Sequence, residues 1–424
     1  MKRISSQLPT FDSNYYQRLR EFDMNEMYGK IGGQTRINKL RDDPLAASRS
    51  SRFQSEILRE GRYGKNIEAV QGTLATAEGD LRSALDILQR VRELGVQGAN
   101  GTLDKTQMGY LGKEVDQLLG ELLTIANTKD QNGNYLFSGT LSRSTPFRTT
   151  NGRVPGGEGD LVTSVDYMGN TGRNAAEISE GDVVGINIPG NVAFWAEQQQ
   201  IYSTVDGTQY RVQRDQTIRI DGAEIHLSPG DTMSAISAKI NDADVSVRAR
   251  IDPVANSLVL ESTVPHQIWA EDLGDGTVLQ DLGILAPSGG PGGPPGGSHP
   301  PLNVSPSARV FGGSIFDMVI GLRNALLAGD GDKVGGAGLR GIENSITNLA
   351  GVLGDVGARD ARLTTTARRI EYQKPVLVGF ESQEHDLDMA DAITQLKMLE
   401  YSHEAALSSA ARALNRPKLL DFLR

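Results

Sequence analysis

The sequence of 424 residues contains no cysteine. This absence excludes disulfide bonds, thiol catalysis and metal sites built on cysteine. Aromatic residues make up only 5 % of the chain, whereas glycine is abundant with 49 residues. These proportions fit slender helical packing and glycine-rich loops better than one large globular core.

Long apolar runs and excess positive charge are also missing. No run approaches the roughly 18 apolar residues of a membrane-spanning helix, and residues 1–16 contain no continuous apolar segment. We therefore expect no membrane insertion and no cleaved secretory signal. The net charge of −10 and the pI of about 5.2 give no overall attraction to nucleic acid, so we expect none as a partner.

Apolar residues with seven-residue spacing mark both ends of the chain. Alternating steps of three and four residues keep one apolar stripe facing a partner helix, as in a coiled coil. In the first arm the stripe comprises Ile67, Val70, Leu74, Ala77, Leu81, Ala84, Leu88 and Val91. In the second arm it comprises Leu339, Ile342, Ile346, Leu349, Leu353, Val356, Leu363, Ile370 and Leu377.

The first arm also carries helix start and stop signals. An acidic cap at Asp42-Asp43 followed by Pro44 predicts a helix start, and residues 98–101 predict its end. Apolar positions from Met108 to Ile125 predict a third helix that turns back on this one. Both segments are expected to belong to one helical domain.

The pattern changes from helical to β near Thr149. Up to residue 287, β-branched residues alternate with polar ones between turn signals such as Asp221-Gly222. A glycine- and proline-rich linker follows, and helix resumes around Ser314. Within the β region we expect a hairpin over 210–227, a short helix over 232–243, and strands over 245–251 and 257–262.

Two short motifs resemble ligand-binding loops. Gly336, Gly338 and Gly341 form GxGxxG, but a dinucleotide site needs a strand directly before the glycines, and the preceding residues predict a loop. Residues 130–134 resemble the start of a calcium loop, but Leu141 stands where a glutamate is required. We interpret 130–134 as an Asn-Gly turn and expect no cofactor.

Acidic residues gather in two places. We interpret Asp42 and Asp43, and the cluster Glu384, Asp386 and Asp388, as helix caps rather than metal sites, because carboxylates favour the positive end of a helix dipole. The five histidines are scattered, and no nucleophile–base pattern is present. The sequence therefore predicts no catalytic, cofactor-binding or metal-binding residues and no enzyme.

Several segments together resemble the flagellin superfamily. They are residues 37–48, 89–102, 122–140 and 388–424 in the two arms, and the inserted segment 217–251. Asp42-Asp43-Pro44, NGNYLFSG at 132–139 and LLDFL at 419–423 are similar to its hook–filament junction members, while 89–97 is similar to filament subunits. Pro375 departs from the pattern, and we expect a kink or a break just before it.

The resemblance implies an α+β multidomain fold, a split α-helical coiled-coil bundle from both termini with an inserted β-rich domain. The domains are expected at 1–150 (first helical arm), 151–287 (β-rich insert), 288–305 (linker) and 306–424 (second helical arm). The implied function is a junction ring that connects hook to filament. A filament subunit, or a binding or adhesion module carried by the insert, remain alternatives.

The resemblance also implies partners and packing residues. The partners are further copies of the chain, the first junction protein, flagellin and an export chaperone, and the location is a flagellum reached without a cleaved signal. Packing between terminal helices is assigned to Ile4, Leu8, Phe11, Tyr15, Ile393, Leu396, Leu407, Ala410, Leu414, Leu419, Leu420, Phe422 and Leu423.

Overall fold

The computed structural model describes residues 8–39, 41–287 and 300–414, and these form two compact units. One unit is built from described residues up to Lys65 and from Thr366 onward, and the other spans Asn66–Thr365. The first unit therefore combines two parts of the chain that are far apart in sequence, whereas the second is one continuous range. No helix in these ranges is long and apolar enough to cross a membrane.

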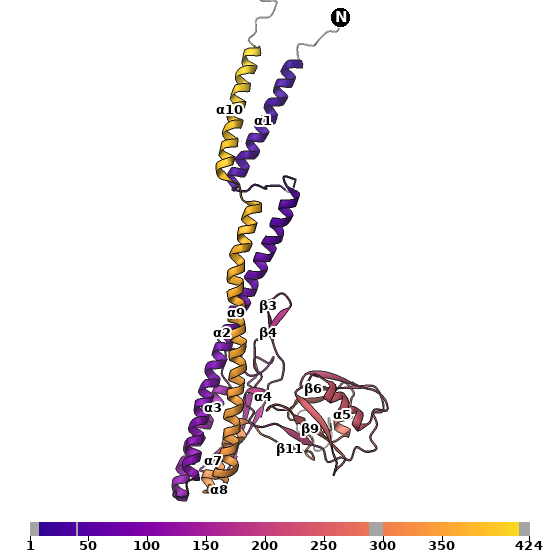
Figure 1. Ribbon diagram of the computed structural model, residues 1–424. Helices are drawn as coiled ribbons and strands as arrows, with labels where there is room; N and C mark the ends of the chain where they lie inside the picture. The colour runs from indigo at the N-terminus through magenta and orange to yellow at the C-terminus, as the bar shows by residue number, and fades with distance from the viewer. Residues whose placement is uncertain (1–7, 40, 288–299, 415–424) are drawn as a thin grey trace, which may run out of the picture. The chain divides into compact units, whose positions relative to one another are not determined.

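The first unit consists of helices from both ends of the chain. Helix α1 (Leu8–Gly33) packs on α10 (Met389–Leu414), and Figure 1 shows the two side by side. The beginning of α2 (Pro44–Ala99) and the end of α9 (Leu339–His385) complete the unit, with Phe53 and Phe380 in ring contact at 5.8 Å. The predicted start of α2 at Pro44 is confirmed.

The helix that contains Pro375 differs from the prediction. Helix α9 continues without a break through Pro375 to His385. Residues 386–388 are not helical, and α10 begins at Met389. Of the two expected effects of Pro375, the break is therefore wrong, and the kink stays a prediction. A proline removes one backbone hydrogen bond, but the other hydrogen bonds of this 47-residue helix continue on both sides of it.

In the second unit, the predicted heptad stripes form the helical core. All eight apolar residues of the first-arm stripe are buried, as are Ile342, Leu349, Val356 and Leu363 on α9. Helices α3 (Lys105–Ala126) and α7 (Ile315–Ala328) pack together beside them. A single turn α8 (Gly331–Lys333) and a π-helical turn η1 (Val334–Gly338) connect α7 to α9.

The β-rich part contains four antiparallel sheets among the described residues. Two are hairpins, β1 (Phe147–Arg153) with β2 (Asp160–Tyr167), and β3 (Ala175–Ser179) with β4 (Asp182–Gly185). The third has the order β10 (Ala270–Leu273), β6 (Gln216–Ile220) and β7 (Ala223–Leu227). The fourth has the order β11 (Arg309–Phe311), β5 (Gln200–Tyr202), β9 (Ser257–Ser262) and β8 (Val247–Asp252).

The two larger sheets share one core with short helices. Helix α5 (Met233–Asp242) is capped by the Thr232 side chain, while α4 (Gly190–Ala193) and α6 (Val278–Asp281) are single turns. Asp221 and Gly222 both have positive φ, as a tight turn between β6 and β7 requires. The predicted hairpin, short helix and strand pair are thereby confirmed. The buried core includes Ile218, Ile236, Leu258 and Leu260.

Aromatic side chains pack where the β-rich insert adjoins the helices, a region that we call the root of the insert. The rings of Phe137, Phe147, Phe194 and Phe316 lie with centroids 5.0–5.6 Å apart. From α9, the side chain of Asn348 donates to the main-chain oxygens of residues 192 and 195. The root of the insert is therefore fixed by both apolar contacts and hydrogen bonds.

Candidate functional site

The candidate site is the helix pair α1–α10, because both helices carry exposed apolar side chains beside the face on which they pack. On α10 the partly or fully covered positions recur at three- and four-residue steps through Ala392, Leu396, Leu399, His403 and Ala406. At the edge of the pair, the Tyr28 hydroxyl donates to Glu400 Oε1 at 2.6 Å. This hydrogen bond is the main reason why the pKa of Tyr28 is raised. The covered stripe joins α1 to α10 within one chain.

A second apolar stripe on α1 remains open. Tyr15, Leu19 and Phe22 follow one another at helical spacing, and each side chain is about half exposed. Contiguous exposed apolar surface is a common feature of protein–protein contacts. We call these three residues the α1 outer stripe.

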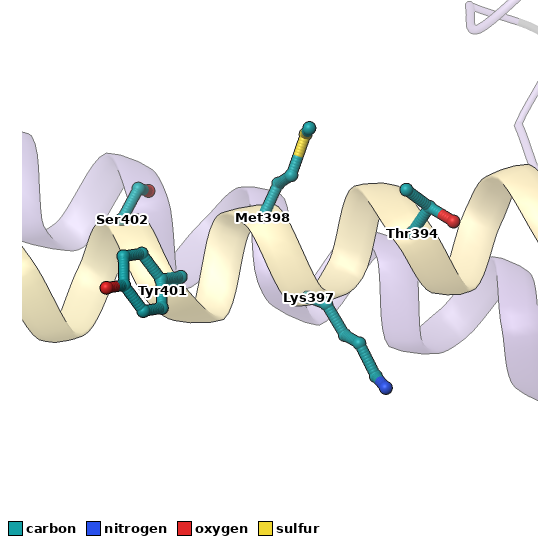
Figure 2. Close-up of a pocket in the computed structure, with 5 residues that line it drawn as sticks. All are labelled: Thr394, Lys397, Met398, Tyr401 and Ser402. Carbon is teal, nitrogen blue, oxygen red and sulfur yellow. The ribbon is translucent and has the colours of Figure 1, made fainter.

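Helix α10 also has an exposed apolar surface. Met398 is 70 % exposed and Tyr401 is 78 % exposed. Together with Thr394, Lys397 and Ser402 they line a shallow groove, and Figure 2 shows that Met398 and Tyr401 project away from the helix. We call this the α10 groove. Its lining is mainly apolar, with a single cation at Lys397.

The predicted packing residues differ in how far the structure describes them and in how exposed they are. Leu396 and Ala410 are half-buried, whereas Tyr15, Ile393 and Leu407 are exposed on this single chain. Leu8, Phe11 and Leu414 belong to α1 and α10, but their side chains lie outside the described part. Ile4, Leu419, Leu420, Phe422 and Leu423 lie outside the described residues. Their assignment to packing between chains stays a prediction.

The acidic residues act as helix caps in two of the predicted places. Asp43 accepts from the backbone N–H of Ala46 at the start of α2, and Asp388 accepts from Ala390 N–H at the start of α10. Asp42 instead closes the preceding loop by accepting from Lys39 N–H. Among the residues that the structure covers, no group of three or more acidic residues and histidines comes together in a way that could hold a metal.

The two loop motifs have structural explanations. Gly338 and Gly341 lie so close to α7 that a Cβ on them would meet Leu322 and Met318 at 2.8 and 2.4 Å. Helical turns, not a strand, precede these glycines, so they serve close helix packing. At 130–134, Asp130 Oδ1 accepts from the backbone N–H groups of Asn132 and Asn134, as expected for a turn.

A buried ion pair between α7 and α3 was not predicted from the sequence. Arg323 on α7 is fully buried, and its guanidinium contacts Asp116 Oδ1 and the Val162 carbonyl oxygen, both at 2.6 Å. The signal was present, because Arg323 interrupts an otherwise apolar helix face over 315–328. The pair connects α3, β2 and α7.

Comparison with known proteins gives matches at both ends of the chain. Residues 18–142 match the model of the bacterial flagellin N-terminal helical region, and residues 339–423 match that of the bacterial flagellin C-terminal helical region. These ranges include α2, α3, α9, α10 and most of α1. The α10 groove lies in the matched regions, as do Leu19 and Phe22 of the α1 outer stripe, whereas Tyr15 lies just before the first matched range.

Individual relatives include both junction and filament proteins. Flagellar hook-associated protein 3 of Escherichia coli is 29 % identical over 147 residues, which cover 32 % of this chain and 45 % of the relative. The matched chain thus spans about half the length of that relative. Flagellin of Clostridium tyrobutyricum is 23 % identical over 387 residues, covering 91 % of this chain and 90 % of the relative.

Comparison with solved structures gives a partial match. The flagellar hook-associated protein-3 from Legionella pneumophila matches with a TM-score of 0.45 and 17 % identity. The match covers 78 % of this chain and 98 % of that protein.

Proposed function

Because the chain belongs to the flagellin superfamily and is a structural component of the bacterial flagellum, we propose that it forms a junction ring between hook and filament. The observation that carries the proposal is the similarity of both arms to the family, combined with the junction-type motifs. Asp42-Asp43-Pro44 caps α2, and Phe137 of NYLFSG anchors the root of the insert. Both motifs occupy defined structural positions.

The open surfaces of the terminal helices support assembly. The α1 outer stripe and the α10 groove are different surfaces, so contact between them joins unlike patches of neighbouring copies. Such head-to-tail contacts produce a ring or a helical array, whereas a twofold dimer would use the same patch twice. Burying one large apolar side chain contributes about 1.5–3 kcal/mol, so a few of these residues suffice to drive association.

The proposal extends to partners and location. A ring between hook and filament contacts the first junction protein on one side and flagellin on the other. Before export, the exposed surface of α10 is the proposed binding site for an export chaperone. The chain would reach the flagellum without a cleaved signal.

A filament subunit is the second candidate function. The flagellin of Clostridium tyrobutyricum aligns over nearly the whole chain, including the insert. A filament subunit would use the same outer surfaces, but in many copies along a helical array. The two roles therefore differ in position and copy number rather than in the chemistry of packing.

Deletion of the gene separates the two roles. A junction protein is required before filament growth, so the deletion strain is expected to carry hooks without filaments and to release flagellin into the medium. A strain that still grows filaments of normal length would contradict the junction role. Strains that lack filaments but release no flagellin would point to the filament subunit itself.

Substitutions in the α10 groove test the packing surface. We expect Met398→Ser with Tyr401→Ser to reduce incorporation into flagella at least about tenfold, because two apolar contacts are lost. The control is Val254→Ser on the insert, where the side chain is 90 % exposed. Quantitative blotting of isolated flagella measures incorporation, and circular dichroism checks the helix content. Normal incorporation of the double variant would contradict the role of the groove.

A further inference from the structure

Both arms of the first unit leave their helices at the same place. Helix α1 ends at Gly33, and Gln34 adopts a positive φ of 54°. Opposite it, α9 ends at His385, and the chain continues to α10. The N–H of Arg36 donates to His385 O at 2.8 Å, and the N–H of Leu387 donates to Gln34 O at 3.2 Å. The two connections are thus tied together by their main chains.

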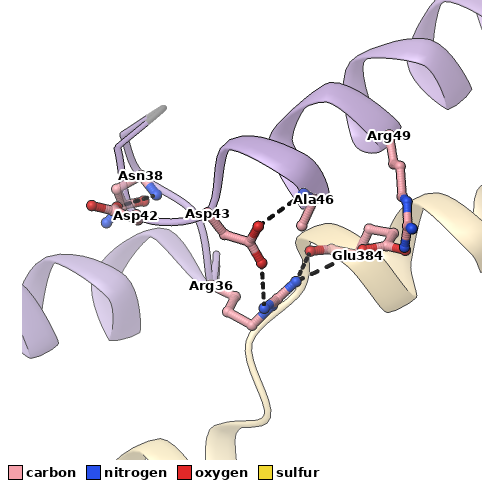
Figure 3. A network of polar contacts seen from close by, with 7 residues as sticks. All are labelled: Arg36, Asn38, Asp42, Asp43, Ala46, Arg49 and Glu384. Carbon is pink, nitrogen blue, oxygen red and sulfur yellow. Dashed lines mark hydrogen bonds and ion pairs between the residues drawn. The ribbon is translucent and has the colours of Figure 1, made fainter.

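The Arg36 side chain links the ends of two further helices. Its Nη2 donates to the main-chain oxygen of Glu384 at 2.8 Å, and its Nη1 donates to Asp43 Oδ2 at 3.4 Å (Figure 3). The carbonyl of Glu384 is in the last turn of α9, where carbonyls lack an intrahelical partner. The other oxygen of Asp43 accepts from Ala46 N–H at the start of α2. One guanidinium therefore caps α9 and holds the residue that caps α2.

The electrostatics favour this arrangement at both helix ends. A cation at the C-terminus of α9 and an anion at the N-terminus of α2 each complement the local helix dipole. The backbone hydrogen bond from Ala46 is the main cause of the lowered pKa of Asp43, to which the charge of Arg36 also contributes. Arg49 adds a contact to Glu384 Oε1 at 3.3 Å.

We propose that Arg36 holds together the two connections, residues 34–36 and 386–388, so that α1 and α10 move as one body relative to the start of α2 and the end of α9. We call these two connections the joint. Because main-chain hydrogen bonds and the Arg36 side chain link the two connections, neither α1 nor α10 shifts without the other. The proposal concerns the single chain and holds for either flagellar role.

Hydrogen exchange on the full chain tests the joint. The reporter is the amide of Leu387, which lies in the connection between α9 and α10 and donates to Gln34 O. Arg36→Gln is expected to speed exchange at 386–388 roughly tenfold, the factor for one charge-assisted hydrogen bond at a partly exposed site. The matched control is Arg41→Gln in the same loop, since Arg41 is 64 % exposed and its one ion pair among the described residues is with its neighbour Asp42. This control is expected to leave exchange at 386–388 unchanged.

A second variant separates capping from simple charge pairing. Glu384→Gln keeps the main-chain oxygen that Arg36 binds, so its effect at 386–388 is expected to be smaller than that of Arg36→Gln. Exchange in the buried segment around Leu88 monitors the remaining fold. The proposal is overturned if Leu387 is unprotected in the wild type, if Arg36→Gln leaves it unchanged, or if Glu384→Gln has the larger effect.

Discussion

Arg323 has the largest side chain that is fully buried in the described part of the chain. A buried cation is tolerated only when it is paired and hydrogen-bonded, and Arg323 meets this condition through Asp116, Asn324 and the carbonyl of Val162. The residue thereby connects α3, β2 and α7 through hydrogen bonds as well as through apolar packing.

Replacing Arg323 therefore has a large predicted cost. Arg323→Gln is expected to lower the free energy of unfolding by about 3–5 kcal/mol, because Asp116 loses its partner in a partly buried site. Arg340→Gln, on the exposed surface of α9, is the control and is expected to change it by less than about 0.5 kcal/mol. Urea unfolding measures both. Equal effects of the two variants would refute a structural role for the pair.

His266 provides a prediction on pH. Burial alone would lower the pKa of His266, but the hydrogen bond and charge of Asp221, with Nε2 and Oδ2 2.8 Å apart, outweigh burial and the charge of Arg173 and raise it. A raised pKa means that the fold favours the protonated ring. This contribution to stability is complete below the ordinary pKa of 6.5 and is lost as the pH rises through the raised value.

Thermal melts between about pH 5.5 and pH 8.5 measure this effect. The wild type is expected to lose stability across this interval, and His266→Gln is expected to lose less. His226→Gln is the control, because His226 lies at an exposed strand position, its ring forms a hydrogen bond with the Thr217 hydroxyl, and its main-chain oxygen accepts from Lys239. The account fails if His266→Gln keeps the full slope.

At the scale of elements, periodicity was the informative signal. The seven-residue stripe predicted α2 and α9 because each apolar position serves one buried seam, and Leu81 and Leu349 are both fully buried. The positions of the helix ends were less predictable. Pro375 did not end α9, whereas the break at residues 386–388 depends on contacts with Gln34 and Arg36, which are distant in sequence.

Two leucines on the same helix test the role of the seam. Leu81→Ala is expected to lower the free energy of unfolding by about 2–5 kcal/mol, because it leaves a cavity in a fully buried position. Leu58→Ala, where the side chain is 71 % exposed, is expected to cost less than about 0.5 kcal/mol. Urea denaturation of both variants provides the comparison. A Leu58 variant as unstable as the Leu81 variant would mean that the seam was assigned to the wrong face.

At the scale of the whole molecule, the two ends of the chain form one helical unit, and the β-rich part belongs to the other unit. The sequence predicted helical ends and a β-rich middle because the two patterns occupy different segments, and the resemblance to the flagellin superfamily implied that the ends form one split domain. The compact units could not be predicted in the same way. One of them combines residues up to Lys65 with those from Thr366 onward, and this pairing depends on tertiary contacts rather than on local pattern.

The ranges assigned to domains accordingly remain a proposal. The same holds for the packing of the terminal helices between copies, because the α1 outer stripe and the α10 groove are uncovered on a single chain. Their apolar character follows from the sequence, but a sequence does not state which molecule covers them. An observation on the assembled flagellum is therefore decisive.

The most direct test of the central claim is immunogold electron microscopy of isolated flagella with an antibody against the β-rich insert. The account predicts a single site of label where hook meets filament. Label along the whole filament would contradict the junction role and identify the chain as a filament subunit. Absence of label from flagella whose hook–filament junction is intact would contradict both flagellar roles.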